Sequence, residues 1–294
     1  MNEFLQQVIN ALNTGSIYAL VAIGYTMVYG IIKLINFAHG DIMMFGAYFA
    51  FIFATAFPFD IPVVFIIILS MALAGFMGFL IERIAYRKLR KAPRISALIT
   101  AIGMSLFLQN LALLVFKAEP KVMPHLISKD QVNIFGLGVP LLTLVTIGIS
   151  VGFMILLTLF VKKTKLGKAM RAVSQDQDAA KLMGINVNSI ISLTFAIGSA
   201  LGALGGIFYS VAYSQVYPTL GVMPGLKAFV AAVLGGIGNI FGAMLGGYII
   251  GFIETFTNGY ISTRWVDAIV FSLLIFVLLF KPSGILGKNT KEKV

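Results

Sequence analysis

Long apolar segments alternate with short polar ones along the whole chain. Seven apolar segments lie at about residues 15–32, 36–56, 61–82, 95–116, 139–161, 188–213 and 264–281. A membrane-crossing α-helix needs about 20 such residues, whereas strands of a membrane barrel alternate apolar and polar residues, as 61–69 does not. A shorter amphipathic helix at the membrane interface is expected over 3–14. The pattern predicts an all-α polytopic membrane protein of about eight transmembrane helices, forming one domain over residues 1–294.

Basic residues are concentrated in three places. Most of the 22 Lys and Arg residues lie in 83–94, in 162–187 and in the tail from Lys281. Cytoplasmic segments of membrane proteins carry such an excess of positive charge. We therefore place these three segments in the cytoplasm, and residues 117–138 and 214–225 outside. Counting back through the first three spans places the N-terminus outside as well.

The stretch 226–258 is apolar but interrupted, with Gly235, Gly236, Gly238 and Asn239 near its middle. The last span supplies one crossing, so this stretch must enter and return if the tail is cytoplasmic. It is too short for two full passes, which need about 40 residues. We predict a broken or re-entrant helix pair that turns at the glycines. Such a backbone at membrane depth survives only where protein buries it or where it lines a cavity.

The composition narrows the classes of function. Charged residues make up 11% of the chain, against roughly 25% in soluble domains. The absence of cysteine excludes disulfides and Cys-ligated metals, and His39 and His125 alone make a weak case for any metal. The net charge of +11 follows the membrane topology, so nucleic acid is not expected as a partner. No protease motif and no nucleotide-binding loop is present, so we expect no catalysis and no cofactor bound by this chain.

Several polar residues interrupt the apolar spans. Ionisable and polar groups inside a membrane are costly and often mark a substrate pathway. Ser105 and Gln109 are four residues apart and share one helix face. Solvated positions at the start of a helix and hydrogen bonds between helices remain open alternatives. The candidate pathway residues are Asn36, His39, Asp41, Ser105, Gln109, Asn110, Gly238 and Asn239.

Two carboxylates, Glu254 and Asp267, lie in or near the last spans. Alone they would be candidates for a proton relay. Lys227 and Arg264 are available as partners, and one or two carboxylates do not make a relay. We therefore expect these groups to form structural ion pairs.

A polar helix is predicted in the cytoplasmic segment at about residues 165–187. Residues 168–183 are helix formers without internal Gly or Pro, and Gly184 is typical of a helix end. The helix has an alanine-rich face, which suits close contact with a groove on a partner. A plain solvated linker helix is the alternative.

The residues Arg171 to Ile185 resemble the coupling segment of permeases in ATP-binding-cassette importers. The whole chain is similar to the branched-chain amino-acid permeases of that class. The shared marks are Asn36 to Gly40, Ile102 to Asn110, Arg171 to Ile185, Leu234 to Ala243 and Lys281 to Gly287. The residues that the resemblance assigns to ATPase coupling are Arg171, Asp176, Ala179, Ala180, Gly184 and Ile185.

The resemblance implies a subunit of a heteromeric importer in the bacterial cytoplasmic (inner) membrane. Its partners would be membrane lipid, a second homologous permease, two cytoplasmic ATPase subunits and an extracytoplasmic solute-binding protein. ATP and Mg²⁺ would bind in the ATPase subunits. The expected substrates are branched-chain amino acids, and the backbone at 235–239 could offer N–H groups to their carboxylate. Urea, short amides or sugars are alternative substrates, and an ion-coupled carrier or passive channel is a different class.

Overall fold

The computed structural model describes residues 2–33, 36–57, 61–90, 92–128, 130–134 and 137–287, which are mostly helical. The helices are α1 (Asn2–Ile32), α2 (His39–Thr55), α3 (Val63–Ile81), η1 (Glu82–Tyr86), η2 (Arg87–Leu89), α4 (Arg94–Phe116), α5 (Leu141–Lys163), α6 (Lys165–Gln175), α7 (Gln177–Leu182), α8 (Val187–Tyr213), α9 (Val222–Gly235), α10 (Ile240–Tyr260), η3 (Thr263–Trp265) and α11 (Val266–Phe280). Two small antiparallel sheets pair β1 (Lys121–Val122) with β4 (Gln215–Val216), and β2 (Gln131–Ile134) with β3 (Leu137–Pro140).

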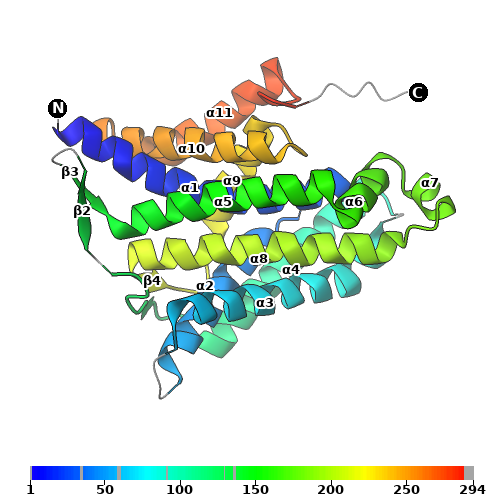
Figure 1. Ribbon diagram of the computed structural model, residues 1–294, viewed down its shortest axis with the longest axis horizontal. Helices are drawn as coiled ribbons and strands as arrows, with labels where there is room; N and C mark the ends of the chain where they lie inside the picture. The colour runs from blue at the N-terminus through cyan, green and yellow to red at the C-terminus, as the bar shows by residue number, and fades with distance from the viewer. Residues whose placement is uncertain are drawn as a thin grey trace.

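Seven helices in the described part of the chain are long and apolar enough to cross a membrane. The other two apolar helices, α2 and α9, have only 17 and 14 residues. This confirms the predicted class, an all-α polytopic membrane protein. The described residues fold into one helical bundle (Figure 1).

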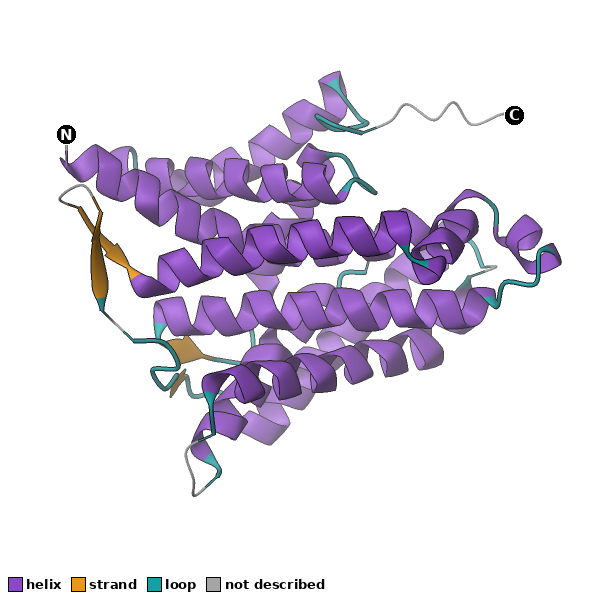
Figure 2. Cartoon of the chain, in the orientation of Figure 1, coloured by secondary structure: helices purple, strands orange, loops and turns teal. Residues whose placement is uncertain are grey.

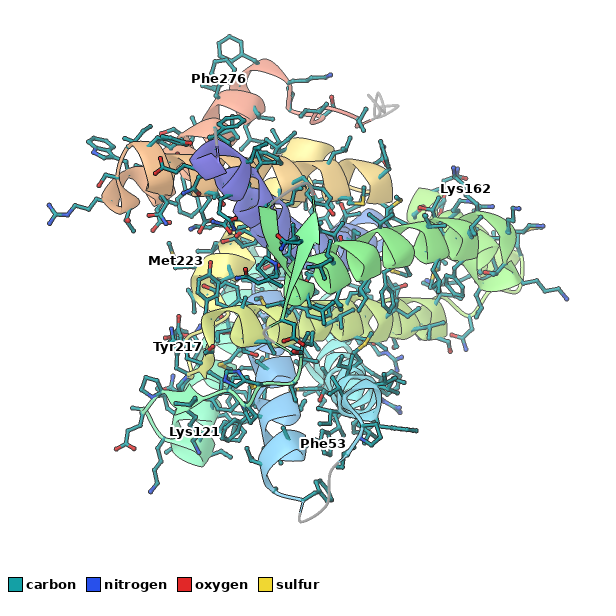
Figure 3. The ribbon with its side chains drawn as sticks, turned by 60° about the vertical axis from the view of Figure 1, so that its left-hand side comes forward. Phe53, Lys121, Lys162, Tyr217, Met223 and Phe276 are labelled. Carbon is teal, nitrogen blue, oxygen red and sulfur yellow. The ribbon has the colours of Figure 1, made fainter. Side chains whose placement is uncertain are left out.

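The centre of the bundle is formed by α1 and α8, which pack against each other and are largely buried. Helices α4, α5 and α11 lie at the periphery and expose large apolar side chains. Examples are Leu114 on α4, Leu156 on α5 and Phe276 on α11, which projects from the bundle in Figure 3. Lipid tails are as apolar as leucine, so these outer faces suit contact with lipid.

Small residues let the central helices approach closely. A Cβ atom added to Gly206 of α8 would lie 2.0 Å from the carbonyl oxygen of Met43 on α2. One added to Gly247 of α10 would lie 2.4 Å from the backbone nitrogen of Ala19 on α1. Both distances are far below van der Waals contact. The glycines therefore serve the tight helix packing that is typical of membrane bundles.

The charge pattern predicts that the N-terminus and the basic segments lie at opposite ends of the bundle. The N-terminal end of α1 lies at one end, together with the sheets β1–β4 and β2–β3 (Figures 1 and 2). Helices α6 and α7 and the last described residues lie at the opposite end. Lys162, at the end of α5 that adjoins α6, points away from the bundle (Figure 3). With the basic segments taken as cytoplasmic, the N-terminus lies on the outer side.

The first helix differs from the prediction. Residues 3–14 were expected to lie at the membrane interface, separate from the span 15–32, but α1 is continuous from Asn2 to Ile32. It packs along α10 over much of its length. At Gly15 the added Cβ would lie 2.9 Å from the Cα of Tyr248. This contact packs α1 closely against α10. The polar first turns therefore continue α1 and do not form a separate helix at the membrane interface.

The predicted helix pair in 226–258 is confirmed, with its turn at the glycines. Helix α9 ends at Gly235, and Gly236 and Gly238 adopt positive φ angles of 104° and 90°. The Asn239 side chain then caps α10 by accepting a hydrogen bond from the Gly242 N–H at 3.2 Å. The carbonyl of Gly235 accepts from the N–H of Leu286, so the broken backbone is satisfied inside the protein.

The expected ion pairs are present around Lys227. Its ammonium lies 3.1 Å from Glu254 and 3.0 Å from Asp267. Tyr18 also donates a hydrogen bond to Glu254 at 2.7 Å. The trio joins α9, α10 and α11, and the tyrosine adds α1. This pairing supports the structural interpretation over a proton relay.

Candidate functional site

Helices α2 and α9 begin inside the bundle rather than at its ends (Figure 1). His39, the first residue of α2, lies against Gly24 and Gly202, which are interior positions of α1 and α8. The start of α9 meets the same place, because a Cβ on Gly221 would lie only 1.8 Å from the carbonyl oxygen of Gly40. Two helix N-termini, each with a partial positive charge, therefore meet within the bundle.

A buried carboxylate lies at this meeting point. Asp41 in the first turn of α2 is 2% exposed, and its Oδ1 accepts a hydrogen bond from the Gln109 amide at 3.0 Å. The same amide donates to Ser105 at 3.0 Å. The second carboxylate oxygen, Oδ2, has no hydrogen-bond partner among the described residues. The structure thus joins three of the predicted pathway residues into one cluster.

A cavity of about 150 Å³ lies beside this cluster, between α1, α2, α4 and α9. Asp41 and Ser105 contribute polar groups to it. Its apolar lining comes from Phe37, Ile102, Leu106, Val222 and Leu226. Leu106 is 54% exposed, so the cavity opens towards the outer face of α4. This arrangement can hold a small solute with one cationic group and one apolar group.

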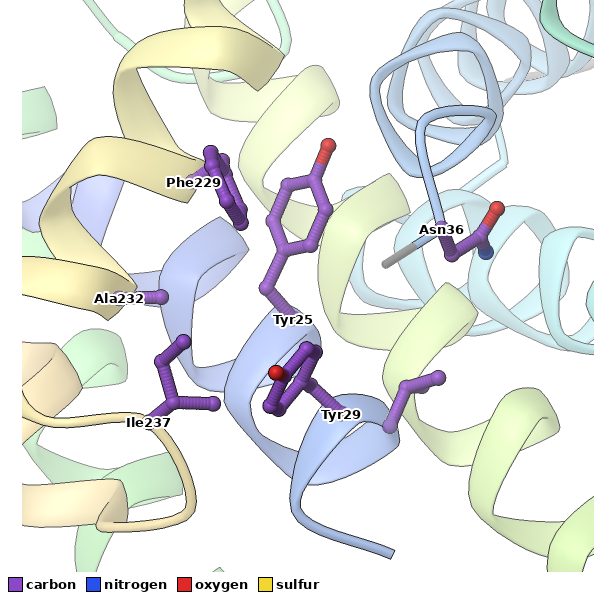
Figure 4. A pocket seen from close by; sticks show the side chains of 7 residues that line it. Tyr25, Tyr29, Asn36, Phe229, Ala232 and Ile237 are labelled. Carbon is purple, nitrogen blue, oxygen red and sulfur yellow. The ribbon is translucent and has the colours of Figure 1, made fainter. Parts of the chain in front are cut away.

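Tyr25 of α1 lines both this cavity and a smaller one, whose lining Figure 4 shows. The smaller cavity holds only about 10 Å³ and is lined by Tyr29, Phe229 and Ile237, among others. These residues lie further towards the end that carries α6 and α7. The rings of Tyr25 and Phe229 are 5.9 Å apart. The side chains of Tyr25 and Phe229 therefore pack together beside the smaller cavity.

Asn36 and His39 lie next to the larger cavity but do not line it. Asn36 borders the smaller cavity, and its side-chain oxygen accepts a hydrogen bond from Tyr86 at 2.8 Å. The His39 ring packs 4.3 Å from the ring of Tyr25. Neither ring nitrogen of His39 has a hydrogen-bond partner in the part of the chain that the structure describes. Its close contacts with glycines favour a packing role between α1 and α8.

The remaining predicted pathway residues lie elsewhere. Asn110 is exposed on α4 and donates to its own helix at Leu106. Gly238 and Asn239 lie in the turn between α9 and α10. Their N–H groups already bond to Thr26 and to the carbonyl of Gly236. The turn therefore does not present these N–H groups to an anion, and Asn239 instead ties it to Leu286.

Replacing Gly238 with valine is expected to impair transport while the subunit still assembles. A positive φ of 90° costs any other residue on the order of 1–3 kcal/mol. The added Cβ itself meets only Gly30, at an ordinary 3.8 Å, so strain rather than a clash is the cause. Uptake and membrane abundance of the variant measure the effect. A matched Gly148→Val change on α5, where a Cβ meets nothing within 4 Å, should leave uptake normal.

The cytoplasmic segment contains two helices, so the prediction of one continuous helix over 168–183 is wrong. The chain turns at Asp176, whose backbone is extended between α6 and α7. Its side chain accepts hydrogen bonds from the N–H groups of Asp178 and Ala179, at 2.8 and 2.9 Å. An aspartate offers its backbone this N-cap alternative to continuing a helix, and the sequence analysis overlooked it.

The motif residues at the end of α7 form a Schellman cap. Gly184 has a φ of 78°, and its N–H bonds to the carbonyl of Lys181 at 2.9 Å. The N–H of Ile185 bonds to the carbonyl of Ala180 at 3.0 Å. Ala180 itself is buried. These hydrogen bonds fix the end of α7, while the predicted coupling residues Asp176, Ala179 and Gly184 are exposed.

Arg171 joins α6 to the preceding helix. Its guanidinium donates a hydrogen bond to the carbonyl of Val161 in the last turn of α5, where carbonyls lack helical partners. Thr164 caps the start of α6 by accepting from the N–H of Gly167 at 2.9 Å. Helices α5, α6 and α7 are thus connected through short, capped turns.

Two large apolar side chains at the end of α7 are exposed. Leu182 is 89% exposed and Met183 is 82% exposed, at the end of the bundle that carries the positive charge. In one continuous helix over 168–183, they would belong to the same apolar face as the alanines. The structure instead buries Val173 and Ala180 and directs Leu182 and Met183 outwards. Isolated capping signals at Asp176 and Gly184 could have shown this.

Comparisons with known proteins identify the family of this chain. A family model described as branched-chain amino acid transport system / permease component matches residues 7–278. The high-affinity branched-chain amino acid transport system permease protein BraD of Pseudomonas aeruginosa is 44% identical, over 99% of this chain and 98% of its own. Its counterpart LivH of Escherichia coli K12 is 43% identical over the same shares. The ribose import permease protein RbsC of Haemophilus influenzae is 25% identical over 93% of this chain and 84% of its own. The chain belongs to the permease components of branched-chain amino acid transport systems.

Proposed function

We propose that this chain is a membrane-spanning subunit of an ATP-driven importer that carries branched-chain amino acids into the bacterial cytoplasm. The observation that carries the proposal is the 44% identity to BraD along nearly the whole of both chains. A member of this family is a transport component rather than an enzyme. A cavity with one carboxylate and an aliphatic lining supports the substrate class.

The proposed partners are a second homologous permease, two cytoplasmic ATPase subunits that hold ATP and Mg²⁺, and an extracytoplasmic binding protein. The exposed Leu182 and Met183 suit a groove on an ATPase. The second permease would cover the aperture of the larger cavity beside Leu106. A carboxylate next to open lipid is costly, so a protein or water-filled cover at Asp41 is favoured.

The coupling mechanism follows from the short connections of α7. Closure of the ATPases would push on Leu182 and Met183. Helix α7 passes the displacement to α8 through the cap at Gly184 and to α5 through α6 and Arg171. Because α8 packs against α1, α2 and α3, its movement would reshape the cavity. The contact between Tyr25 and Phe229 would then open towards the cytoplasm.

Uptake by the complete transporter, reconstituted in vesicles, tests this function. Leucine should accumulate only with ATP, and the ATPase subunits should co-purify with this chain. Accumulation without ATPase subunits would support an ion-coupled carrier or channel instead. Preferential uptake of urea, a short amide or ribose would overturn the substrate assignment but keep the importer class. The 25% identity to a ribose permease makes the sugar a necessary comparison.

A further inference from the structure

We infer that the cavity of about 150 Å³ between α2, α4 and α9 binds the substrate as a zwitterion, with the free Oδ2 of Asp41 as the partner of its α-ammonium group. This inference rests on the proposed function and adds the chemical group that is recognised and the residue that recognises it. It also assigns a binding site within this one chain.

The first argument is the state of the Asp41 carboxylate. Gln109 satisfies one of its oxygens, and the other lacks a hydrogen-bond partner among the described residues while the side chain is 2% exposed. A buried carboxylate without a counter-charge is destabilising. No Lys or Arg lines the cavity, and the ion pairs found within the described residues do not include Asp41. The partial positive charges of the two helix N-termini offset part of this cost, and a cationic ligand group would supply the remaining counter-charge.

The second argument is the rigid placement of this oxygen. Ser105 and Gln109 lie on one face of α4, and their hydrogen bond at 3.0 Å orients the Gln109 amide towards Asp41. The backbone contact between Gly40 and Gly221 fixes the start of α2 against the start of α9. The Asp41 side chain, which contributes to the lining of the cavity, is therefore held in one place, as recognition of an ammonium group requires.

The third argument is the chemistry of the opposite walls. The first turn of α9 carries no acidic residue, and Gly221, Val222 and Gly225 bring that turn to the cavity. Its partial positive charge favours a carboxylate group. Ile102 and Leu106 add aliphatic surface to the lining, and Tyr25 and Phe37 add aromatic rings. An engineered cavity of roughly 150 Å³ holds benzene, so a branched aliphatic side chain is of suitable size.

Photolabelling with a diazirine analogue of leucine tests the site in the purified full chain, held in lipid nanodiscs. Labels should fall on the cavity-lining parts of α4 and α9, near Ile102 and Val222. Asp41→Asn keeps the shape of the side chain and removes its charge, so labelling should fall at least 10-fold. Asp130→Asn makes the same change in an exposed loop and should leave labelling unchanged.

Competition experiments show whether the site recognises the ammonium group or the carboxylate group of the substrate. Isopentylamine, which has the ammonium but no carboxylate, should reduce labelling of the unaltered chain more than 4-methylpentanoate, which has only the carboxylate. That preference should vanish in Asp41→Asn. Equal labelling of Asp41→Asn and the unaltered chain would overturn the inference, as would stronger competition by the acid.

A second variant covers the case in which Asp41→Asn does not fold. Ile102 is 46% exposed at the rim, so Ile102→Trp should fold and fill the cavity, which would abolish labelling. Labelling that persists in this variant would contradict the site. Leucine uptake by the unaltered complete transporter is measured in parallel. If neither variant changes labelling but the complete transporter takes up leucine normally, only the Asp41 site is refuted. If the complete transporter takes up no leucine, the proposed function is refuted.

Discussion

Replacing both Leu182 and Met183 with serine is expected to weaken binding of the ATPase subunits and to abolish ATP-driven uptake. The two side chains are 89% and 82% exposed, so their removal leaves the packing of this chain unchanged. Full burial of one such side chain in a partner contributes roughly 1.5–3 kcal/mol. Since about 1.4 kcal/mol corresponds to tenfold in affinity, the double change should weaken ATPase binding at least about 100-fold. Co-purification and leucine uptake measure the effect.

A matched control distinguishes docking by α7 from general loss of apolar surface. Leu166→Ser changes an apolar side chain that is 45% exposed on α6, at the same end of the bundle. It should retain most ATPase binding and uptake. If the double variant kept full uptake, or if Leu166→Ser lost as much, α7 would not be the specific contact.

The coupling segment has a local structure that single-helix periodicity does not predict. The resemblance points to Arg171 to Ile185, and the alanine-rich pattern suggests one contact face along a single helix. In the structure Ala180 is buried, Asp176 caps α7 and Gly184 ends it. Asp176 and Gly184 thus set the bounds of α7, and Leu182 and Met183 are exposed at its end. Single-helix periodicity could not reveal this, because it assumes that no break occurs at Asp176.

The sequence predicts some of the residues that line or border the larger cavity. Polar residues in apolar spans identified Asp41, Ser105 and Gln109, because each is costly in a membrane without a partner. Gly238 and Asn239 were grouped with them only because a break in a helix often lines a site. Which break does so depends on where helices begin in three dimensions. The start of α9 meets α2 through Gly221 and Gly40, a contact between distant segments that local patterns do not encode.

Lys227 is expected to contribute strongly to the stability of the bundle. It is 8% exposed, and its partners Glu254 and Asp267 are 18% and 49% exposed. Methionine at this position keeps the volume but leaves Glu254 without its cation. Breaking one partner from a buried pair costs about 3–5 kcal/mol, and the exposure of Asp267 means that most of this effect comes from Glu254. The melting temperature of the purified chain should fall markedly.

The double variant Lys227→Met with Glu254→Gln decides whether charge is the cause. The glutamine is neutral and can still accept the hydrogen bond from Tyr18, which is 2.7 Å from the carboxylate. Removal of both charges avoids an unpaired buried ion, so much of the lost stability should return. Lys162→Met, an equivalent change at an exposed lysine, should have little effect. If the double variant is no more stable than Lys227→Met alone, the ion pair does not hold α9 to α10, and the lysine acts through packing of its aliphatic chain.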